Sequence, residues 1–384
     1  MKTITLTFGM HAPIYLKRYR FFDIGATHDY LDIACNRTET RRIAAEIYIP
    51  LTTMLERMLK RHEGRLRIAI YVSGIAMEQF RSYAPDVVKG LKRIANTGFA
   101  EFTGGTYSYS LSSLAGVEAF GHEVSRHAEM VRREFGQQPE TFCNTALLYS
   151  DEIGYMASSL GYKTMFAGGS SNLLGWRSPG YIYANAANQR LKILPRNEQI
   201  SVELHTAEID STEGEIINIV TDFHYGFVHG MTPAEWVYAC ESFIEQTLRT
   251  GTYNYALPRE CARKHQPVGL LHADTPCAGE DGLTEWLGNE LQQEAFAQLY
   301  ARSGRVLSLS DRNYTHVWEF MQSLEHFERM STRHPDSSSA YDTFINYMNI
   351  LSDFARELEH STAAKGMKFE HTHPKAVEYE YEFS

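Results

Sequence analysis

The sequence predicts an α/β fold in which a closed or nearly closed barrel of parallel strands is followed by a helical bundle. Strand-like and helix-like segments alternate over the first two-thirds of the chain, which is typical of parallel strands joined by crossover helices. About seven of the strand segments are strong, which is enough to close a barrel. After Leu283 the pattern becomes wholly helical.

The strand candidates are short runs of apolar and β-branched residues. Ile4, Leu6 and Phe8 alternate with threonines, so they share one side of a first strand. Ile216–Thr221 reads IINIVT, a nearly continuous apolar run typical of a strand buried on both faces. The full set of candidates is residues 4–8, 66–73, 99–103, 142 with its neighbours, 163–167, 216–221 and 268–272.

The helix candidates follow from periodicity and from glycine stops. In residues 39–62 an apolar residue recurs every fourth position, from Ile43 to Leu59. Glycines end the segments 84–97 and 117–135, and another helix is expected over 151–160. We expect a barrel domain over 1–280, a bundle over 281–370 made of segments 283–301, 314–332 and 341–359, and a polar tail over 371–384 that frays.

Composition excludes several classes of function. The formal net charge of −10 disfavours binding to nucleic acid. No apolar run is long enough to cross a membrane, and the N-terminus alternates like a strand rather than forming a signal peptide. The five cysteines are odd in number and lack CxxC spacing, so we expect reduced, structural thiols in a cytoplasmic protein. No cofactor and no metal are expected. The oligomeric state stays open.

Polar residues cluster where the predicted strands end. Barrel proteins bind their ligands at that rim, although a lone histidine there is more often a satisfied core group. The candidates are His11, Glu101, Tyr107, Asn144, Asp222, His224 and His229. Asp222 directly follows a predicted buried strand, so it is either a proton donor at the sheet edge or the N-cap of the next segment.

Five motifs in this order resemble glycoside hydrolase family 57, in its α-amylase-like branch. They are His11-Ala-Pro13, with Lys17 to Gly25 after it; Gly98 to Glu101, with Tyr109 where the family often has histidine; Phe142 to Gly154; Asp222 to His229; and Glu280-Asp281 with Trp286 to Ala295. The resemblance implies a distorted (β/α)7-type barrel with a C-terminal helical bundle. It also implies a retaining mechanism with two carboxylates about 5 Å apart.

By this resemblance, Asp222 is the acid/base and Ala146 occupies the position of the nucleophilic glutamate. Alanine cannot attack a sugar, so action on α-1,4-glucosidic bonds, by hydrolysis or transfer, is expected to be weak or absent. Ala146 is compatible with a natural loss or with an introduced Glu→Ala change. The resemblance further implies α-glucan or malto-oligosaccharide binding by His11, Glu101, Tyr107, Tyr109, Asn144, Trp176, His224, Asp281 and Trp286. Trp176 and Trp286 are equally compatible with core positions.

Three alternatives remain open. In the first, Asp151 or Glu152 replaces the missing carboxylate, although the start of a predicted helix favours a structural role for both. In the second, the chain binds α-glucan without cleaving it. In the third, it is a metal-dependent deacetylase-like hydrolase using His11, Asp222, His224 and His229, but their spacing matches no zinc signature.

Overall fold

The computed structural model describes residues 1–384 except 205–208, 210–211, 223–229, 281, 334–339 and 365–384. It contains two five-stranded sheets. The first has the order β3 (Ala100–Phe102), β2 (Ile68–Val72), β1 (Lys2–Met10), β8 (Ile216–Thr221), with β9 (Tyr253–Tyr255) also on β1. The second has the order β10 (Leu270–Leu271), β6 (Tyr183–Asn185), β7 (Lys192–Pro195), β5 (Thr164–Ala167), β4 (Thr141–Phe142).

Backbone hydrogen bonds join the two sheets into a ring. Gly104 donates to the Thr141 carbonyl and accepts from the Cys143 amide, both at 2.8 Å, which joins β3 to β4. On the other side, the Asn197 amide donates to the Asn218 carbonyl at 2.8 Å, which joins the end of β7 to β8. The ring therefore runs β1-β2-β3-β4-β5-β7-β8 and its laddered pairs are parallel. The predicted seven-stranded, distorted barrel is confirmed.

One ring strand differs from the prediction. The segment 268–272 forms β10, which pairs with β6 outside the ring, whereas the unpredicted β7 completes the ring. β7 has only four residues and ends in Pro195, so it offers no periodic signal. Burial of Ile193 and Leu194 stabilises it instead.

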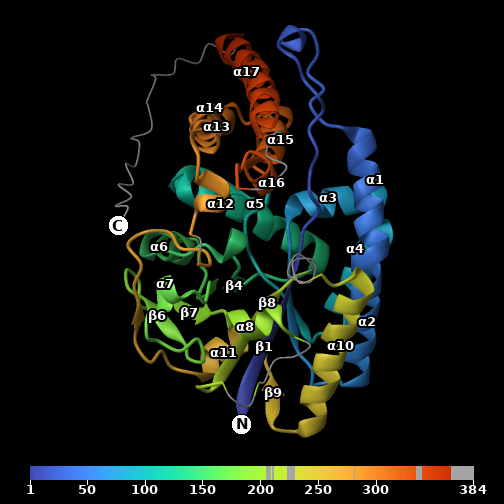
Figure 1. Cartoon of the computed structure of the whole chain (residues 1–384), viewed down its shortest axis with the longest axis vertical. Coiled ribbons are helices and arrows are strands. Elements are labelled where there is room, and N and C mark those ends of the chain that lie inside the picture. The colour runs from blue at the N-terminus through green and yellow to red at the C-terminus, as the bar shows by residue number, and fades with distance from the viewer. Residues whose placement is uncertain (205–208, 210–211, 223–229, 281, 334–339, 365–384) are drawn as a thin grey trace.

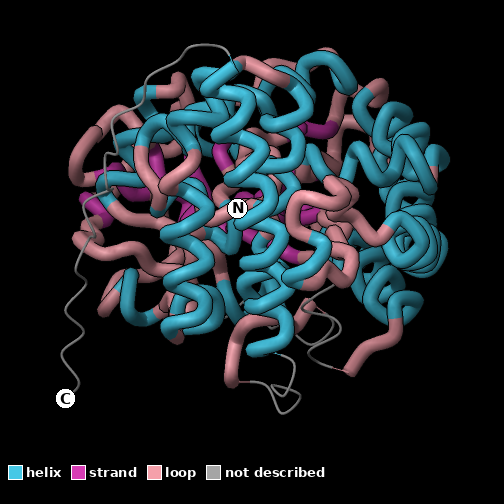
Figure 2. Tube along the Cα trace, turned by 90° about the horizontal axis from the view of Figure 1, so that it is seen from above, coloured by secondary structure: helices cyan, strands magenta, loops and turns pink. Residues whose placement is uncertain are grey.

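Helices surround the strands (Figure 2). The predicted helix over 39–62 is α1 (Ile33–Ile43), a π-helical segment (Ala44–Tyr48) and α2 (Ile49–Arg61), and its apolar stripe from Ile43 to Leu59 is buried. The unpredicted α3 (Gly74–Tyr83) follows β2. The other barrel helices are α4 (Pro85–Ala95), α5 (Val117–Phe135), α6 (Asp151–Ser159), α7 (Ser171–Leu174), α8 (Glu198–Val202), α10 (Pro233–Thr250) and α11 (Pro258–Lys264). Among these described helices and those below, none has the length and apolar character needed to cross a bilayer.

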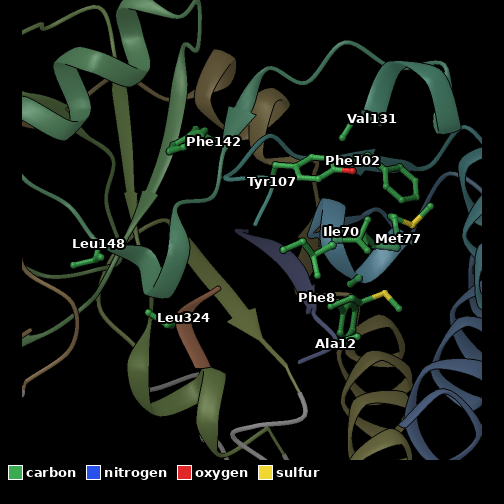
Figure 3. Packing of buried hydrophobic residues seen from close by; sticks show 14 of the residues in the cluster. Phe8, Ala12, Ile70, Met77, Phe102, Tyr107, Val131, Phe142, Leu148 and Leu324 are labelled. Atoms are coloured by element: carbon green, nitrogen blue, oxygen red, sulfur yellow. The ribbon is translucent and has the colours of Figure 1, made fainter. Parts of the chain in front are cut away.

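Alternate faces of the strands build two apolar clusters. Ile4, Leu6 and Phe8 face the helices, and Phe8 lies together with Ile70 of β2 there (Figure 3). Tyr71, Phe166, Val220 and their neighbours form the second cluster, on the opposite face of these strands. All five cysteines are free.

The C-terminal helices lie beyond one end of the barrel (Figure 1). They are α12 (Thr284–Leu287), α13 (Glu290–Tyr300), α14 (Ser303–Leu309), α15 (Arg312–Met321), α16 (Leu324–Glu328) and α17 (Ala340–Ala364). The chain between β1 and α1 extends up to α17, where Asp353 accepts from the Tyr30 hydroxyl and the Gly25 amide, both at 2.6 Å. The helical region predicted after Leu283 is confirmed. The helices before α17 are shorter than expected because Asn289 and Asp311 cap new ones, whereas α17 extends beyond the expected 341–359.

Candidate functional site

Asp222 lies at the carboxyl end of β8, beside the end of β1. The register pairs Phe8 with Thr221, so Gly9 and Asp222 are neighbours across the two strands. A Cβ atom on Gly9 would lie 3.3 Å from the Asp222 Cβ, so the glycine leaves room for this side chain. Burial, and then the charge of Asp222, raise the pKa of Cys143 to about 12. The ring strands are parallel, so Asp222 and the segment that follows β4 lie at the same end of the barrel.

That segment forms a tight turn around Ala146. β4 is only two residues long, and a 3-10 turn over Thr145–Leu147 follows it. Ala146 and Leu147 have φ angles of 50° and 55°, a left-handed conformation that costs roughly 1–2 kcal/mol for each non-glycine residue. Strain of this kind is found preferentially at functional sites. Ala146 is also the only residue in 141–150 that is not buried.

Buried polar contacts hold this strained turn in place. The hydroxyls of Thr106 and Thr145 are 2.7 Å apart. The Asn144 amide group donates to the Ser113 hydroxyl at 3.1 Å and to the Leu148 carbonyl at 2.9 Å. The surrounding structure therefore fixes the backbone at position 146, whose residue is partly exposed.

His11 forms a second part of the same end of the barrel. Its ring stacks on Tyr109 with centroids 4.6 Å apart, and its Nδ1 lies 2.7 Å from the Ser73 hydroxyl. Its Nε2 contacts the carboxylate of Glu325, which belongs to α16 in the helical region. His11 and Tyr109 thus meet, and a helix from the bundle supports them.

Glu325 was not predicted from the sequence, because it lies far from His11 along the chain. Burial opposes its ionisation, but the neighbouring His11 and the Ser323 hydroxyl lower the pKa of Glu325 to about 2. The carboxylate therefore stays charged over the physiological range. Nothing in the local sequence of α16 separates this glutamate from Glu328 nearby.

Glu123, on α5, holds the loop that carries Tyr109. Its carboxyl oxygens accept hydrogen bonds from the Ser108 amide and hydroxyl, both at 2.8 Å, and from the Ser110 hydroxyl at 3.0 Å. Tyr109, between them, has a φ of 53°, and its carbonyl accepts from the Leu324 amide at 3.1 Å. Burial, and then the charge of Glu319, raise the pKa of Glu123 to about 7.

Replacing Glu123 with glutamine is expected to change how stability depends on pH. In the folded protein Glu123 keeps its proton up to about pH 7, whereas an unfolded glutamate loses it near pH 4.5. Its contribution to the free energy of unfolding therefore falls as pH rises from about 4.5 to about 7. Urea unfolding of Glu123→Gln between pH 4.5 and 8 should lack this fall. Glu118→Gln, at an exposed position of the same helix, is the control; identical profiles for both variants would contradict the assignment.

Three predicted contact residues prove to be buried supports. Glu101 is fully buried, and its Oε2 accepts from the Arg259 amide at 3.2 Å. Tyr107 is buried and donates its hydroxyl to Glu78. Asn144 is buried within the turn at position 146. Each of these three side chains serves the fold and has almost no exposed surface here, and the expectation that they contact a substrate stays a prediction.

The two tryptophans differ. Trp176 is 91% exposed just after α7, with the Arg177 guanidinium 5.5 Å from its ring centre. Trp286 is partly buried in α12 and donates its indole N–H to Glu328 at 3.2 Å. The core alternative therefore fits Trp286 better, whereas Trp176 offers a free flat face. The predicted residues His224, His229 and Asp281 lie outside the described residues.

Asp151 and Glu152 do not complete the site. Asp151 accepts from the Ala273 amide at 3.1 Å and contacts His272, while Glu152 is exposed on α6. Within the described ranges, the single group of possible metal ligands is Asp151 with His272 and Asp274. His11 is instead engaged by Ser73 and Glu325, so the described residues do not support the metal-dependent alternative.

The comparisons with known proteins agree with this architecture. The model of glycosyl hydrolase family 57 matches residues 5–276. The chain belongs to this family. The "Putative alpha-amylase" of Methanocaldococcus jannaschii is 26% identical over 405 residues, covering 91% of this chain and 84% of that protein.

Solved structures of the family share the fold. The family 57-type branching enzyme of Pyrococcus horikoshii superposes with a TM-score of 0.69 at 13% identity, covering 96% of this chain and 92% of that one. The 4-alpha-glucanotransferase of Thermococcus litoralis gives a TM-score of 0.60 at 13% identity, covering 83% of this chain. This family 57 chain spans only 53% of that enzyme's length.

Proposed function

We propose that this family 57 chain acts on α-glucans by the retaining amylase type of chemistry, with hydrolysis or transfer weak or absent. One observation carries the proposal. Ala146 is the only residue in 141–150 that is not buried, and it lies on a strained turn at the barrel end that holds Asp222. A turn held this firmly suits a side chain that must face a ligand.

The chemistry follows from what each position can supply. Asp222 would donate a proton to the departing oxygen of the bond between two sugars. The covalent step needs a carboxylate on the opposite side of the anomeric carbon, and the methyl group of Ala146 cannot attack. A water molecule could fill the vacated space, but a methyl group cannot activate it. Sugar binding therefore persists while bond cleavage is slow.

The relatives support the choice of substrate class. They are a "Putative alpha-amylase", a branching enzyme and a 4-alpha-glucanotransferase, and all three activities concern α-linked glucose. Hydrolysis and transfer differ only in whether water or a sugar hydroxyl accepts the glycosyl group, so both fit this site.

Two measurements on the unmodified protein test the proposal. Calorimetry with maltoheptaose should show saturable binding, and an assay for new reducing ends should show little or no cleavage. Turnover comparable to that of ordinary α-amylases would refute the impaired activity. Absence of heat with maltoheptaose, amylose and glycogen would refute the substrate class.

A non-catalytic α-glucan-binding role is the second candidate, and Trp176 favours it. Flat aromatic faces stack on sugar rings, and the Trp176 ring is almost wholly exposed. We expect Trp176→Ala to weaken maltoheptaose binding by about three- to tenfold, on the order of 1 kcal/mol. The matched control is Tyr238→Ala, which removes another exposed aromatic, on α10. Equal affinities of Trp176→Ala and the unmodified protein in calorimetry would remove Trp176 from the binding surface.

A further inference from the structure

A cavity of about 500 Å³ lies at the end of the barrel opposite to Asp222 and Ala146. Its lining includes Glu140 just before β4, Lys163 just before β5, and Lys192, the first residue of β7. These strands are parallel, so their starts share one end of the barrel. Arg190, Arg259 and Arg263 complete the charged lining.

Positive charge dominates this cavity. Five of its side chains are cationic, against one carboxylate, in a chain whose formal net charge is −10. Arg263 is paired with Glu140. Lys192 donates to the carbonyls of Ala262 and His265 at 2.6 and 2.9 Å. The fold thus uses two of the five cations.

Of the other three cations, two are free to contact a ligand and the third is partly exposed. Lys163 and Arg190 are exposed, and their side chains have no hydrogen-bond or ion-pair partner among the residues that the structure describes. Arg259 is half-buried, and its charge acts on the buried Glu101. Neutral polar groups lie between them: Asn188 donates to the Ser158 hydroxyl at 2.8 Å, and both residues line the cavity.

We propose that this cavity binds the phosphate group of a small phosphorylated molecule, such as a sugar phosphate or a nucleotide. Guanidinium and ammonium groups form charge-assisted hydrogen bonds with phosphate oxygens, which are roughly twice as strong as those between neutral groups. The volume lies within the range of small-molecule sites. A concave site on an acidic protein favours a small anion over a nucleic acid polymer. This proposal does not depend on activity toward α-glucans.

The test is calorimetric titration of the unmodified protein with inorganic phosphate, glucose 1-phosphate, glucose 6-phosphate and AMP. Sodium chloride replaces each ligand at matched ionic strength in the blank. We expect saturable binding of at least one phosphate compound. Tighter binding of a sugar phosphate or of AMP than of inorganic phosphate would identify the organic part, and equal binding would assign the affinity to the phosphate group alone.

Variants locate the binding. Lys163→Ala and Arg190→Ala should each weaken it about tenfold, because each removes a charge-assisted hydrogen bond. Both positions are exposed, so folding should be unaffected. Lys89→Ala, on α4 and away from the cavity lining, is the control. The proposal fails if none of the four compounds binds saturably, if Lys163→Ala and Arg190→Ala both bind as the unmodified protein does, or if Lys89→Ala weakens binding equally.

Discussion

Replacing Ala146 with glutamate is expected to raise the rate of maltooligosaccharide cleavage about a thousandfold or more, because loss of a nucleophile typically costs several powers of ten in rate. The backbone at position 146 already has the left-handed conformation and is held by the Thr145 and Asn144 contacts. A glutamate there would need no new turn to point away from the core. Reducing-end release from maltoheptaose measures the gain.

Two matched variants separate this explanation from others. Ala146→Gln has nearly the same size as the glutamate variant but cannot attack, so it should stay as slow as the unmodified protein. Ala146→Glu combined with Asp222→Asn should lose the gain, because the proton donor is removed. If the Ala146→Glu variant folds and binds maltoheptaose but does not cleave it, the site has been remodelled for binding alone.

Replacing Glu325 with alanine is expected to lower the free energy of unfolding by about 2–3 kcal/mol, the usual cost of removing a charged hydrogen-bond acceptor from buried donors. Glu325 is buried between the Ser323 hydroxyl and the His11 ring, so its removal leaves both without their acceptor. Urea unfolding at pH 7 measures the loss. Glu359→Ala breaks an exposed pair with Arg305 and should cost less than about 1 kcal/mol.

The pH dependence gives a second readout for Glu325. Because its folded-state pKa is depressed to about 2, its stabilising contribution is present above about pH 4.5 and is lost as pH falls toward 2. Glu325→Gln should remove this part of the acid sensitivity. If the Glu325→Ala variant unfolds at the same urea concentration as the unmodified protein, the role assigned to the pair with His11 is contradicted.

The sequence carried enough information to predict the barrel and the strands that lead to His11 and Asp222. Alternation of Ile4, Leu6 and Phe8, and the apolar run that ends before Asp222, reflect burial within single strands, so local patterns reveal them. Glu325 and Glu123 could not be found in this way. Their partners, His11 and Ser108, come from other elements, and only tertiary packing brings each pair together.

The burial of Glu101 shows the same limit. Glu101 is adjacent to the end of β3 along the chain, yet a strand alternates its side chains, and the pattern does not reveal which face is closed to solvent. Glu101 lies inward, where the Arg259 amide satisfies one of its oxygens. β7 escaped prediction for another reason, because four residues ending in proline carry too little periodicity to identify a strand.

The most direct test of the central claim is a crystal structure of the unmodified chain with maltotetraose. The α-glucan proposal predicts a glucose ring between the Ala146 methyl group and the Asp222 carboxyl group, with the bond to the next sugar within reach of that carboxyl. An oligosaccharide bound only at another surface, or electron density for a side chain closing the space between these two residues, would contradict it.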